Sequence, residues 1–293
     1  MVQAGTSRFN RVLVATDLCA GGRRALQRAL LLPLNSHAII RLVHVSDHRA
    51  APGKHETELL NALLSEAAWA ESNSEVPVQV ERQLLRGRIF HEIAKCARET
   101  DAEIILLGGD RARGPWSRGT AATLVARKSR RPVLIARLPP TEYHRAIAAV
   151  ALSGDEDYVL SPALKVIGGT DAKIDLLHAW SLPHKSSLAL SSSWQQLRSD
   201  EKQEHESARR ALNSAARQVS KGAHLGRVRL RHGHAVNIIL REAQARNAQL
   251  LVLGSSAKTG FEEAMAGGVA DALLASLDRD VLLARPEQSG REA

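Results

Sequence analysis

Glycines follow short apolar runs of this chain in a pattern that can hold a phosphate or another anion. In the stretch 249–285, the apolar run 250–253 stops at Gly254, and a polar loop then leads to Gly267 and Gly268 before a helical pattern. Backbone N–H groups at a strand end and a helix start point toward a ligand, and the helix dipole favours negative charge there. The spacing predicts an anion site. The alternative is that the glycines only allow a tight strand–helix turn and bind no ligand.

The same order of features occurs earlier in the chain, at residues 103–137. Gly108 matches Gly254, and Gly119 with Thr120 matches the later glycine pair. Further upstream the matching pairs, in the same order, are Gly87 with Gly233 and His44 with His178. Self-similarity at a long period indicates two copies of one domain.

The repeat and the composition of the remaining segments set the expected domain boundaries. We expect a first domain at 1–138 and a second at 146–286. The segment 139–145 begins with Pro139 and Pro140 and is predicted to be a linker, and the polar end at 287–293 is predicted to be disordered.

Each copy alternates apolar runs with helical patterns. The runs predict strands at 12–15, 38–45, 76–84, 146–152, 174–179 and 227–230. The helical patterns predict helices at 23–32, 56–71, 89–99, 194–221 and 235–246, and another that ends near 167. Near-continuous apolar strands alternating with helices are typical of a parallel sheet covered on both faces, so the fold class is α/β, with two tandem doubly wound domains.

Composition narrows the classes of function. The net charge is +9, which favours nucleic acid as a partner, but aromatic residues are only 3%, too few for a base-stacking surface. We therefore interpret the arginines as a solvated surface. The chain has no apolar run that could span a membrane and no signal-peptide core, and its two cysteines lie far apart, so a reducing, cytoplasmic location is expected. His232 and His234 give only two metal ligands, and no metal site or catalytic residue is predicted.

The chain has VATD at the end of the first strand, LVHV in the second strand and the glycine loop after the fourth strand. In these motifs it resembles the universal stress protein (UspA-like) family over nearly its whole length. The resemblance implies a five-stranded parallel sheet in each copy, a Rossmann-like, adenine-nucleotide alpha-hydrolase-like fold. Several members of this family bind ATP through G-x2-G-x9-G-(S/T). A strand-one Asp contacts the nucleotide, and the residue after a His in strand two flanks the adenine. Other members bind no nucleotide and act through dimers or partner proteins.

In the first copy, the resemblance implies a nucleotide site with one irregular position. The implied residues are Ala15, Thr16, Asp17, Val45, Gly108, Arg111, Gly119 and Thr120. Arg111 stands where the family has its second glycine, and the loop to Gly119 is two residues shorter than the family pattern. A large side chain there obstructs a close backbone approach to phosphate, but a guanidinium can itself bind phosphate, and the sequence leaves both readings open.

In the second copy, the glycine loop has the family length but the strand-one acid is missing. The implied residues are Ala179, Gly254, Ser255, Ala257, Gly267 and Gly268. Leu152 or Ser153 is expected opposite Asp17. The second copy thus keeps the phosphate end of the motif better, and the first copy keeps the nucleoside end better.

The resemblance leads to a functional hypothesis. We expect a cytoplasmic stress-response regulator that binds ATP or another adenine nucleotide, with magnesium left open, in at least one domain and acts through an unidentified protein partner. A ligand-free interaction scaffold and a weak ATPase are the alternatives. The last strands of the two copies are expected to pair edge to edge, imitating a family homodimer, and a further homodimer is left open; no membrane or nucleic-acid partner is expected.

Overall fold

A computed structural model describes residues 7–46, 54–109, 124–125, 129–152, 157–180, 194–220, 224–254 and 269–284. The first half of the chain alternates strands and helices, and its elements are β1 (Phe9–Ala15), α1 (Ala20–Leu30), β2 (Leu34–Ser46), α2 (Lys54–Asn73), β3 (Val78–Arg86), α3 (Ile89–Glu99), β4 (Ile104–Gly108) and β5 (Val133–Ala136). The second half repeats this order, with β6 (Arg145–Ala149), α5 (Asp157–Ile167), β7 (Lys173–Trp180), α6 (Trp194–Ser220), β8 (Leu225–His232), α7 (Ala235–Ala245), β9 (Leu250–Gly254), α9 (Val269–Ser276) and β10 (Asp280–Ala284).

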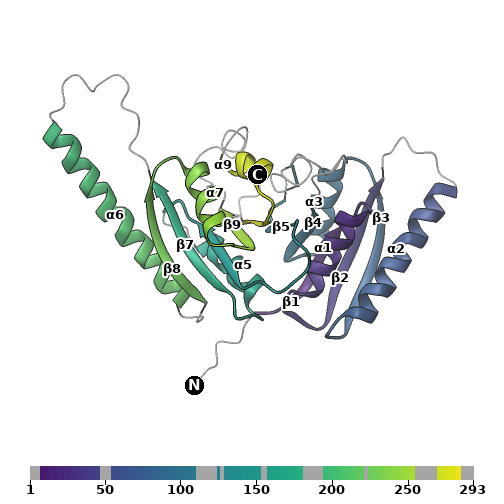
Figure 1. The fold of residues 1–293 in the computed structure, drawn as a ribbon. Helices are drawn as coiled ribbons and strands as arrows, with labels where there is room; N and C mark the ends of the chain where they lie inside the picture. The colour runs from purple at the N-terminus through teal and green to yellow at the C-terminus, as the bar shows by residue number, and fades with distance from the viewer. Residues whose placement is uncertain are drawn as a thin grey trace.

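The ten strands of the described residues form one sheet, in the order β3-β2-β1-β4-β5-β10-β9-β6-β7-β8. Within each half every neighbouring pair is parallel, as the apolar strands predict. The halves meet at β5 and β10, which pair antiparallel with Leu134 opposite Leu282. The expected edge-to-edge pairing of the last strands is therefore confirmed, and it leaves β3 and β8 as the outer strands of the sheet (Figure 1).

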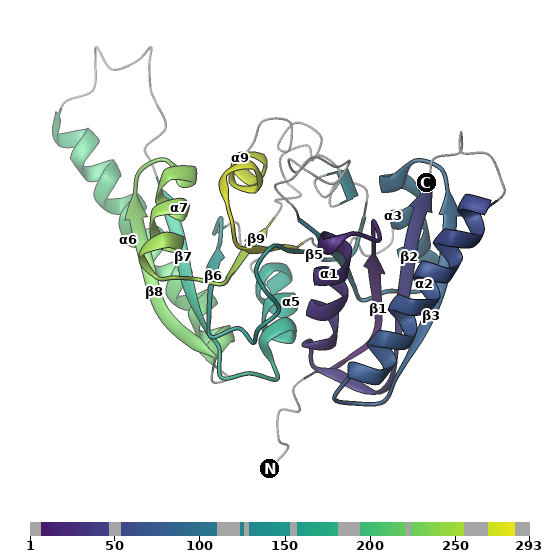
Figure 2. The ribbon, with the colours of Figure 1, turned by 45° about the vertical axis from the view of Figure 1, so that its right-hand side comes forward.

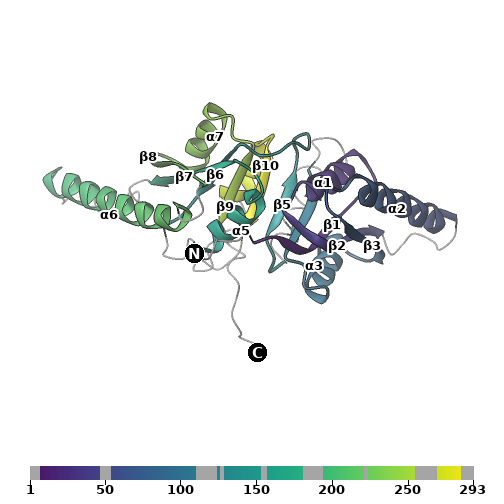
Figure 3. The same ribbon diagram turned by 90° about the horizontal axis from the view of Figure 1, so that it is seen from below.

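Alternate residues of the strands supply two hydrophobic layers, one on each face of the sheet. One layer joins Val12 and Val14 of β1 to Leu26 of α1, and it also includes residues of α2, α5 and α6. The other joins Leu13 of β1 to Ile93 of α3, and it also includes residues of α7 and α9. Both layers contain residues from both halves, so each layer continues across the junction between the halves. Helices α2 and α6 lie at opposite ends of the molecule (Figure 3).

The observed elements differ from the expected ones mainly at their ends. The second strand begins at Leu34 rather than 38, and the strand expected at 146–152 ends at Ala149. On α2 the apolar stripe is wider than its buried face: Leu63 is fully buried, but Leu60 and Leu64 are about half exposed. This helix covers only the outer part of the sheet, so it has fewer partners than its sequence pattern suggests.

The segment expected to be a linker is pinned to the first domain by a buried arginine. Arg28 of α1 is 2% exposed, donates hydrogen bonds to the carbonyls of Pro139 and Thr141, and stacks its guanidinium 4.3 Å from the ring centre of Tyr143. The Nε of Arg28 also lies 2.9 Å from Oδ2 of Asp280, the first residue of β10. A charged contact thus joins the first helix of one half to the last strand of the other.

Asp280 is fully buried and has four partners. Its Oδ1 accepts the backbone N–H groups of Arg137 (2.7 Å) and Leu138 (2.8 Å), and its Oδ2 accepts the Tyr143 hydroxyl (2.6 Å) in addition to contacting Arg28. Burial, and then the nearby charge of Asp280, raises the pKa of Tyr143 well above its usual value, so the phenol keeps the proton that it donates. We call Arg28, Tyr143 and Asp280 the polar triad.

A second ion pair between the halves joins Glu103, at the start of β4, to Lys165 of α5. The Oε1 of Glu103 also accepts the N–H groups of Asn10 (2.7 Å) and Arg11 (3.0 Å). Burial raises the pKa of Glu103, but the hydrogen bonds from Lys165 and from these two N–H groups outweigh it and lower the pKa below 4.5.

The lowered pKa of Glu103 predicts a pH dependence of stability. The ionised carboxylate stabilises the fold fully above the unfolded-state pKa of about 4.5, and this contribution is lost as the pH falls through the lower folded-state pKa. Denaturant unfolding at pH values from 7 to 3 should therefore show that the free energy of unfolding falls more steeply with decreasing pH in the wild type than in Glu103→Gln. Gln249 shows that an amide suits this position, because its Oε1 accepts the N–H groups of His144 and Arg145 in the second half. Parallel pH profiles for the two proteins would contradict the assignment.

Candidate functional site

The carboxyl ends of β1, β2 and β4 meet at one edge of the first half. Ala15, near the end of β1, pairs with Val43 of β2 on one side and with Leu107 of β4 on the other. The chain leaves β1 toward β2 but reaches β4 only after β3, so β1 and β4 flank the point where the strand order reverses. Ligands of open α/β sheets bind in the crevice at such a point.

Asp17 lies directly after β1 at this crevice, where it holds the start of α1. Its Oδ1 accepts the backbone N–H groups of Cys19 (3.0 Å) and Gly22 (3.1 Å). A carboxylate at a helix N-terminus satisfies free N–H groups and is favoured by the helix dipole. No hydrogen bond to Oδ2 arises from the described residues.

The start of α1 comes unusually close to the end of β4. A Cβ atom added to Gly108 would lie 2.2 Å from the backbone carbon and oxygen of Gly21. Gly22 is equally confined, because its Cβ would lie 2.1 Å from the hydroxyl oxygen of Thr16. The glycines at these positions let β4 and the N-terminus of α1 border the same space.

The other first-half residues at this edge are mostly buried in the turn that shapes it. Ala15 and Val45 are 3% and 7% exposed, and Thr16 is 2% exposed. The Thr16 hydroxyl oxygen accepts the N–H of Leu18 at 2.9 Å, and Leu18 adopts a left-handed backbone with φ of 59°. The Thr16 side chain therefore fixes the turn, and Asp17, which is partly buried, follows it at the start of α1.

Two histidines at matching positions fasten the ends of the first strands. Nδ1 of His44 lies 2.9 Å from the carbonyl oxygen of Thr16, and Nδ1 of His178 lies 2.8 Å from that of Val150. A carbonyl only accepts hydrogen bonds, so in each case Nδ1 carries the proton. These contacts give both histidines a structural role, and they place Val45 and Ala179 at equivalent positions.

The strand register corrects the residue expected opposite Asp17. Val12 pairs with Ile104, and Ala146 pairs with Leu250, so Ala151 is the equivalent of Asp17, not Leu152 or Ser153. The backbone agrees, because Leu152 has the left-handed φ of 55° that Leu18 has in the first half. The apolar sequence AVAL hides the end of this strand, which explains the error. Ala151 has no carboxylate for a ligand or for the N-terminus of α5.

The second half also differs at its helix start and at Gly254. Counting from Ala151, the positions of Gly21 and Gly22 carry Asp155 and Glu156, and α5 begins with Asp157. A Cβ on Gly254 would meet side-chain atoms, Cγ2 of Val159 at 2.4 Å and the hydroxyl of Tyr158 at 2.9 Å. Gly254 is exposed and Ala179 is partly buried. The sequence before α5 is therefore more acidic than the sequence before α1, and side chains rather than backbone border Gly254.

Several predicted site residues lie outside the described part of the chain, namely Arg111, Gly119, Thr120, Ser255, Ala257, Gly267 and Gly268. The described residues that the structure brings together at the first edge are Ala15, Thr16, Asp17, Val45 and Gly108. Gly21 and Gly22 were not predicted as site residues. Their sequence signal was a glycine pair at a helix start four residues after an acid.

Within the described residues, no group of three or more His, Cys, Asp or Glu side chains could hold a metal ion. His232 instead contacts Trp180 edge to face, with ring centres 4.8 Å apart. None of the helices in the described ranges combines the length and the apolar character needed to cross a bilayer.

Comparison with known proteins places this arrangement in a family. Among solved structures, a universal stress protein from Archaeoglobus fulgidus DSM 4304 is similar over 95% of this chain and 97% of its own, with 17% identity and a TM-score of 0.69. A protein of unknown function from Pseudomonas aeruginosa PAO1 is similar over 95% and 93%, with 19% identity and a TM-score of 0.66. At these identities the similarity shows the fold alone. A universal stress protein in complex with cAMP matches 46% of this chain, with a TM-score of 0.37.

No curated protein matches the chain. The sequence pattern of the universal stress protein family, in contrast, matches twice, over residues 8–137 and 142–285. These two matches cover most of the chain and follow the two halves of the ten-stranded sheet. The chain therefore belongs to the universal stress protein family as a tandem member with two family domains.

Proposed function

We propose that the first domain binds ATP or another adenine nucleotide at the crevice between β1 and β4. The observation that carries this proposal is the carboxylate of Asp17, which the N-terminus of α1 holds at the carboxyl end of β1. The family resemblance gives this position its contact with the nucleotide. Gly21 and Gly108 pack backbone against backbone, so neither residue places a side chain at this edge.

The second domain is proposed not to bind nucleotide. Ala151 replaces the nucleotide-contacting acid, and three acidic residues, Asp155, Glu156 and Asp157, fall at or before the first turn of α5. Negative charge there stabilises the helix but repels phosphate groups. The second glycine loop keeps the family spacing, and under this proposal it serves as a strand–helix turn.

The proposed role is regulatory rather than metabolic. Asp17 is the carboxylate that the described residues place at this edge, and its Oδ1 accepts two backbone N–H groups, so it holds the start of α1. We propose that nucleotide changes the surface that the cytoplasmic protein presents to a protein partner in a stress response. On this proposal the two domains, 1–138 and 146–286, are joined by the linker 139–145, and the β5–β10 pairing replaces a homodimer contact.

Substitution of Asp17 separates the binding proposal from its alternatives. Asp17→Ala should weaken the affinity for ATP with magnesium by roughly tenfold or more, because a charge-assisted contact is lost. Asp17→Asn keeps an oxygen that can accept the N–H groups of Cys19 and Gly22, so it should weaken binding with little loss of stability. Isothermal titration calorimetry measures the affinity, and thermal unfolding measures the stability.

The matched control is Asp157→Asn at the start of α5, which should leave ATP affinity unchanged. If wild type and Asp17→Ala bound ATP with equal affinity, the proposal that nucleotide binds at Asp17 would be contradicted. Steady phosphate release that is lost in Asp17→Ala would favour the weak ATPase instead.

A further inference from the structure

The two sides of the domain junction are related by the internal repeat but differ in what fills them. Glu103 accepts the N–H groups of Asn10 and Arg11, and Gln249 accepts those of His144 and Arg145 in the same way. Asn10 therefore matches His144, and the residues just before them, Phe9 and Tyr143, are equivalent. The register of β4 with β5 and of β9 with β10 makes Pro132 the equivalent of Asp280. The buried faces of α1 and α5 make Pro162 the equivalent of Arg28.

All three members of the polar triad are therefore replaced on the opposite side by apolar residues. Phe9 lacks the hydroxyl of Tyr143, Pro132 lacks the carboxylate of Asp280, and Pro162 lacks the guanidinium of Arg28. On the side of the triad, these groups and the linker carbonyls fill the junction. On the opposite side the junction contains a cavity of about 410 Å³, which we call the junction pocket.

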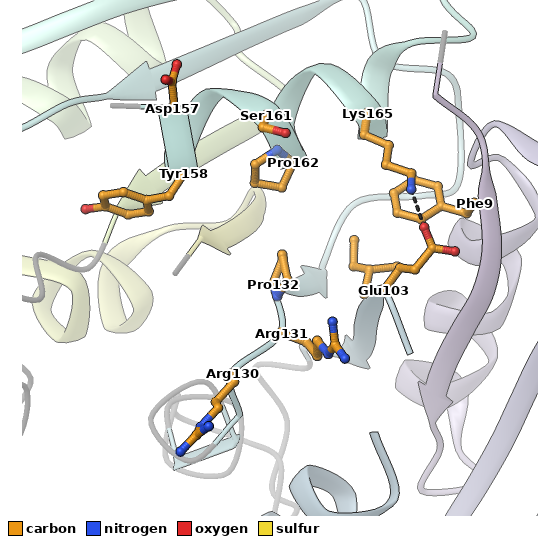
Figure 4. Close-up of a pocket in the computed structure, with 11 residues that line it drawn as sticks. Phe9, Glu103, Arg130, Arg131, Pro132, Asp157, Tyr158, Ser161, Pro162 and Lys165 are labelled. Carbon is orange, nitrogen blue, oxygen red and sulfur yellow. Dashed lines mark hydrogen bonds and ion pairs between the residues drawn. The ribbon is translucent and has the colours of Figure 1, made fainter. Parts of the chain in front are cut away.

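The junction pocket lies between α5 of the second domain and the amino ends of β4 and β5 of the first. Its lining residues are Phe9, Glu103, Ile104, Arg130, Arg131, Pro132, Asp157, Tyr158, Ser161, Pro162 and Lys165. Figure 4 shows Pro162 on α5 opposite Pro132 at the start of β5, with Lys165 extending from the same helix toward Glu103. The junction pocket lies at the amino end of β4, whereas the proposed nucleotide site lies at the carboxyl ends of β1 and β4. Figure 2 shows α1 and α5 in the middle of the molecule, on either side of the join.

The walls of the junction pocket suit a flat apolar group. The rings of Phe9, Pro132 and Pro162 and the side chain of Ile104 line it, and the Lys165 ammonium lies 4.5 Å from the Phe9 ring centre. Pockets of roughly 300–1,000 Å³ with apolar walls and a few polar groups are typical sites for small molecules. The hydroxyl groups of Tyr158 and Ser161 can accept or donate hydrogen bonds at its edge.

The charges around the junction pocket favour a monoanion. The lining contains three basic side chains, Arg130, Arg131 and Lys165, and two carboxylates, Glu103 and Asp157, which leaves an excess of one positive charge. Glu103 is already neutralised by Lys165 and by two backbone N–H groups. Arg131 contacts the exposed Asp101 at 3.4 Å, and Arg130 has no ion pair or hydrogen bond with any other described residue.

We propose that the junction pocket is a second ligand site, which binds a small aromatic monocarboxylate between the two prolines with its carboxylate toward Arg130 and Arg131. Such a ligand contacts both domains, because α5 belongs to one and β4 and β5 to the other. It would supply to this side of the junction the apolar bulk and the charge pairing that the polar triad supplies to the other side.

The test uses benzoate as the probe and benzamide as its neutral analogue. Saturation-transfer NMR on the full chain should detect benzoate binding, and excess ATP should not displace it. Benzamide should bind at least about tenfold more weakly, because it lacks the charge that the arginines recognise. Arg130→Gln should weaken benzoate binding roughly tenfold, whereas the matched control Arg82→Gln, at an exposed arginine of β3, should leave it unchanged.

A second variant fills the junction pocket without touching the proposed nucleotide site. The double substitution Pro132→Asp with Pro162→Arg copies the Arg28–Asp280 pair and should abolish the benzoate signal while ATP binding persists. The proposal is overturned if wild type gives no benzoate signal, if the double variant binds benzoate undiminished, or if benzamide binds as well as benzoate. Displacement of benzoate by ATP would place it in the nucleotide crevice and would also overturn the proposal.

Discussion

Asp280→Ala is expected to lower the free energy of unfolding by about 3–5 kcal/mol, the largest stability effect predicted for this chain. The substitution leaves the Arg28 guanidinium, which is 2% exposed, without its counter-charge in the core. It also removes the acceptor of the Tyr143 hydroxyl and of two backbone N–H groups. Urea unfolding followed by circular dichroism measures the loss.

The control for this prediction is Asp171→Ala, which removes an exposed carboxylate of the second domain and should change stability by no more than about 0.5 kcal/mol. A double-mutant cycle with Arg28→Ala tests the pairing itself. In the Arg28→Ala background, removing Asp280 should lower the free energy of unfolding by much less than it does in the wild type. Additive losses would show that Arg28 and Asp280 stabilise the junction independently.

Gly108→Ala is expected to combine a loss of about 1–3 kcal/mol in unfolding free energy with loss of nucleotide binding. The new Cβ would lie 2.2 Å from backbone atoms of Gly21, so α1 must move away from β4. Asp17 is hydrogen-bonded to the start of that helix and would move with it. Thermal unfolding and ATP titration of the same preparation measure the two effects.

Gly254→Ala is the matched substitution in the second domain. Its Cβ would meet side-chain atoms of Val159 and Tyr158 rather than backbone, so the neighbours can adjust and the loss of stability should be smaller. ATP affinity should not change, because this edge lacks the acid. A loss of ATP binding in Gly254→Ala, with binding retained in Gly108→Ala, would move the site to the second domain.

The sequence predicted the repeat, the parallel strands and the pairing of the last strands because these depend on local apolar patterns that occur twice. The strand run 12–15 and the helix residues Ala25, Leu26 and Ala29 are all buried, as their periodicity indicates. The family motif likewise led to Asp17 and Gly108, which the structure places at one edge of the sheet.

Features that depend on contacts between distant segments were not predicted. Arg28 and Asp280 are charged residues of ordinary helix and strand patterns, and nothing local indicates that they pair in the core 2.9 Å apart. The segment 139–145 has the composition of a loose linker, yet it contains the buried Tyr143. The error at Ala151 has a different cause, since a strand followed by more apolar residues gives no sequence signal for its end.

The most direct test of the account is the number of ATP molecules that bind to each chain. Isothermal titration calorimetry of the full-length protein with ATP and magnesium should give one site per chain, because the first domain has Asp17 and the second has Ala151 at the same position. No detectable binding, or two equivalent sites, would contradict it.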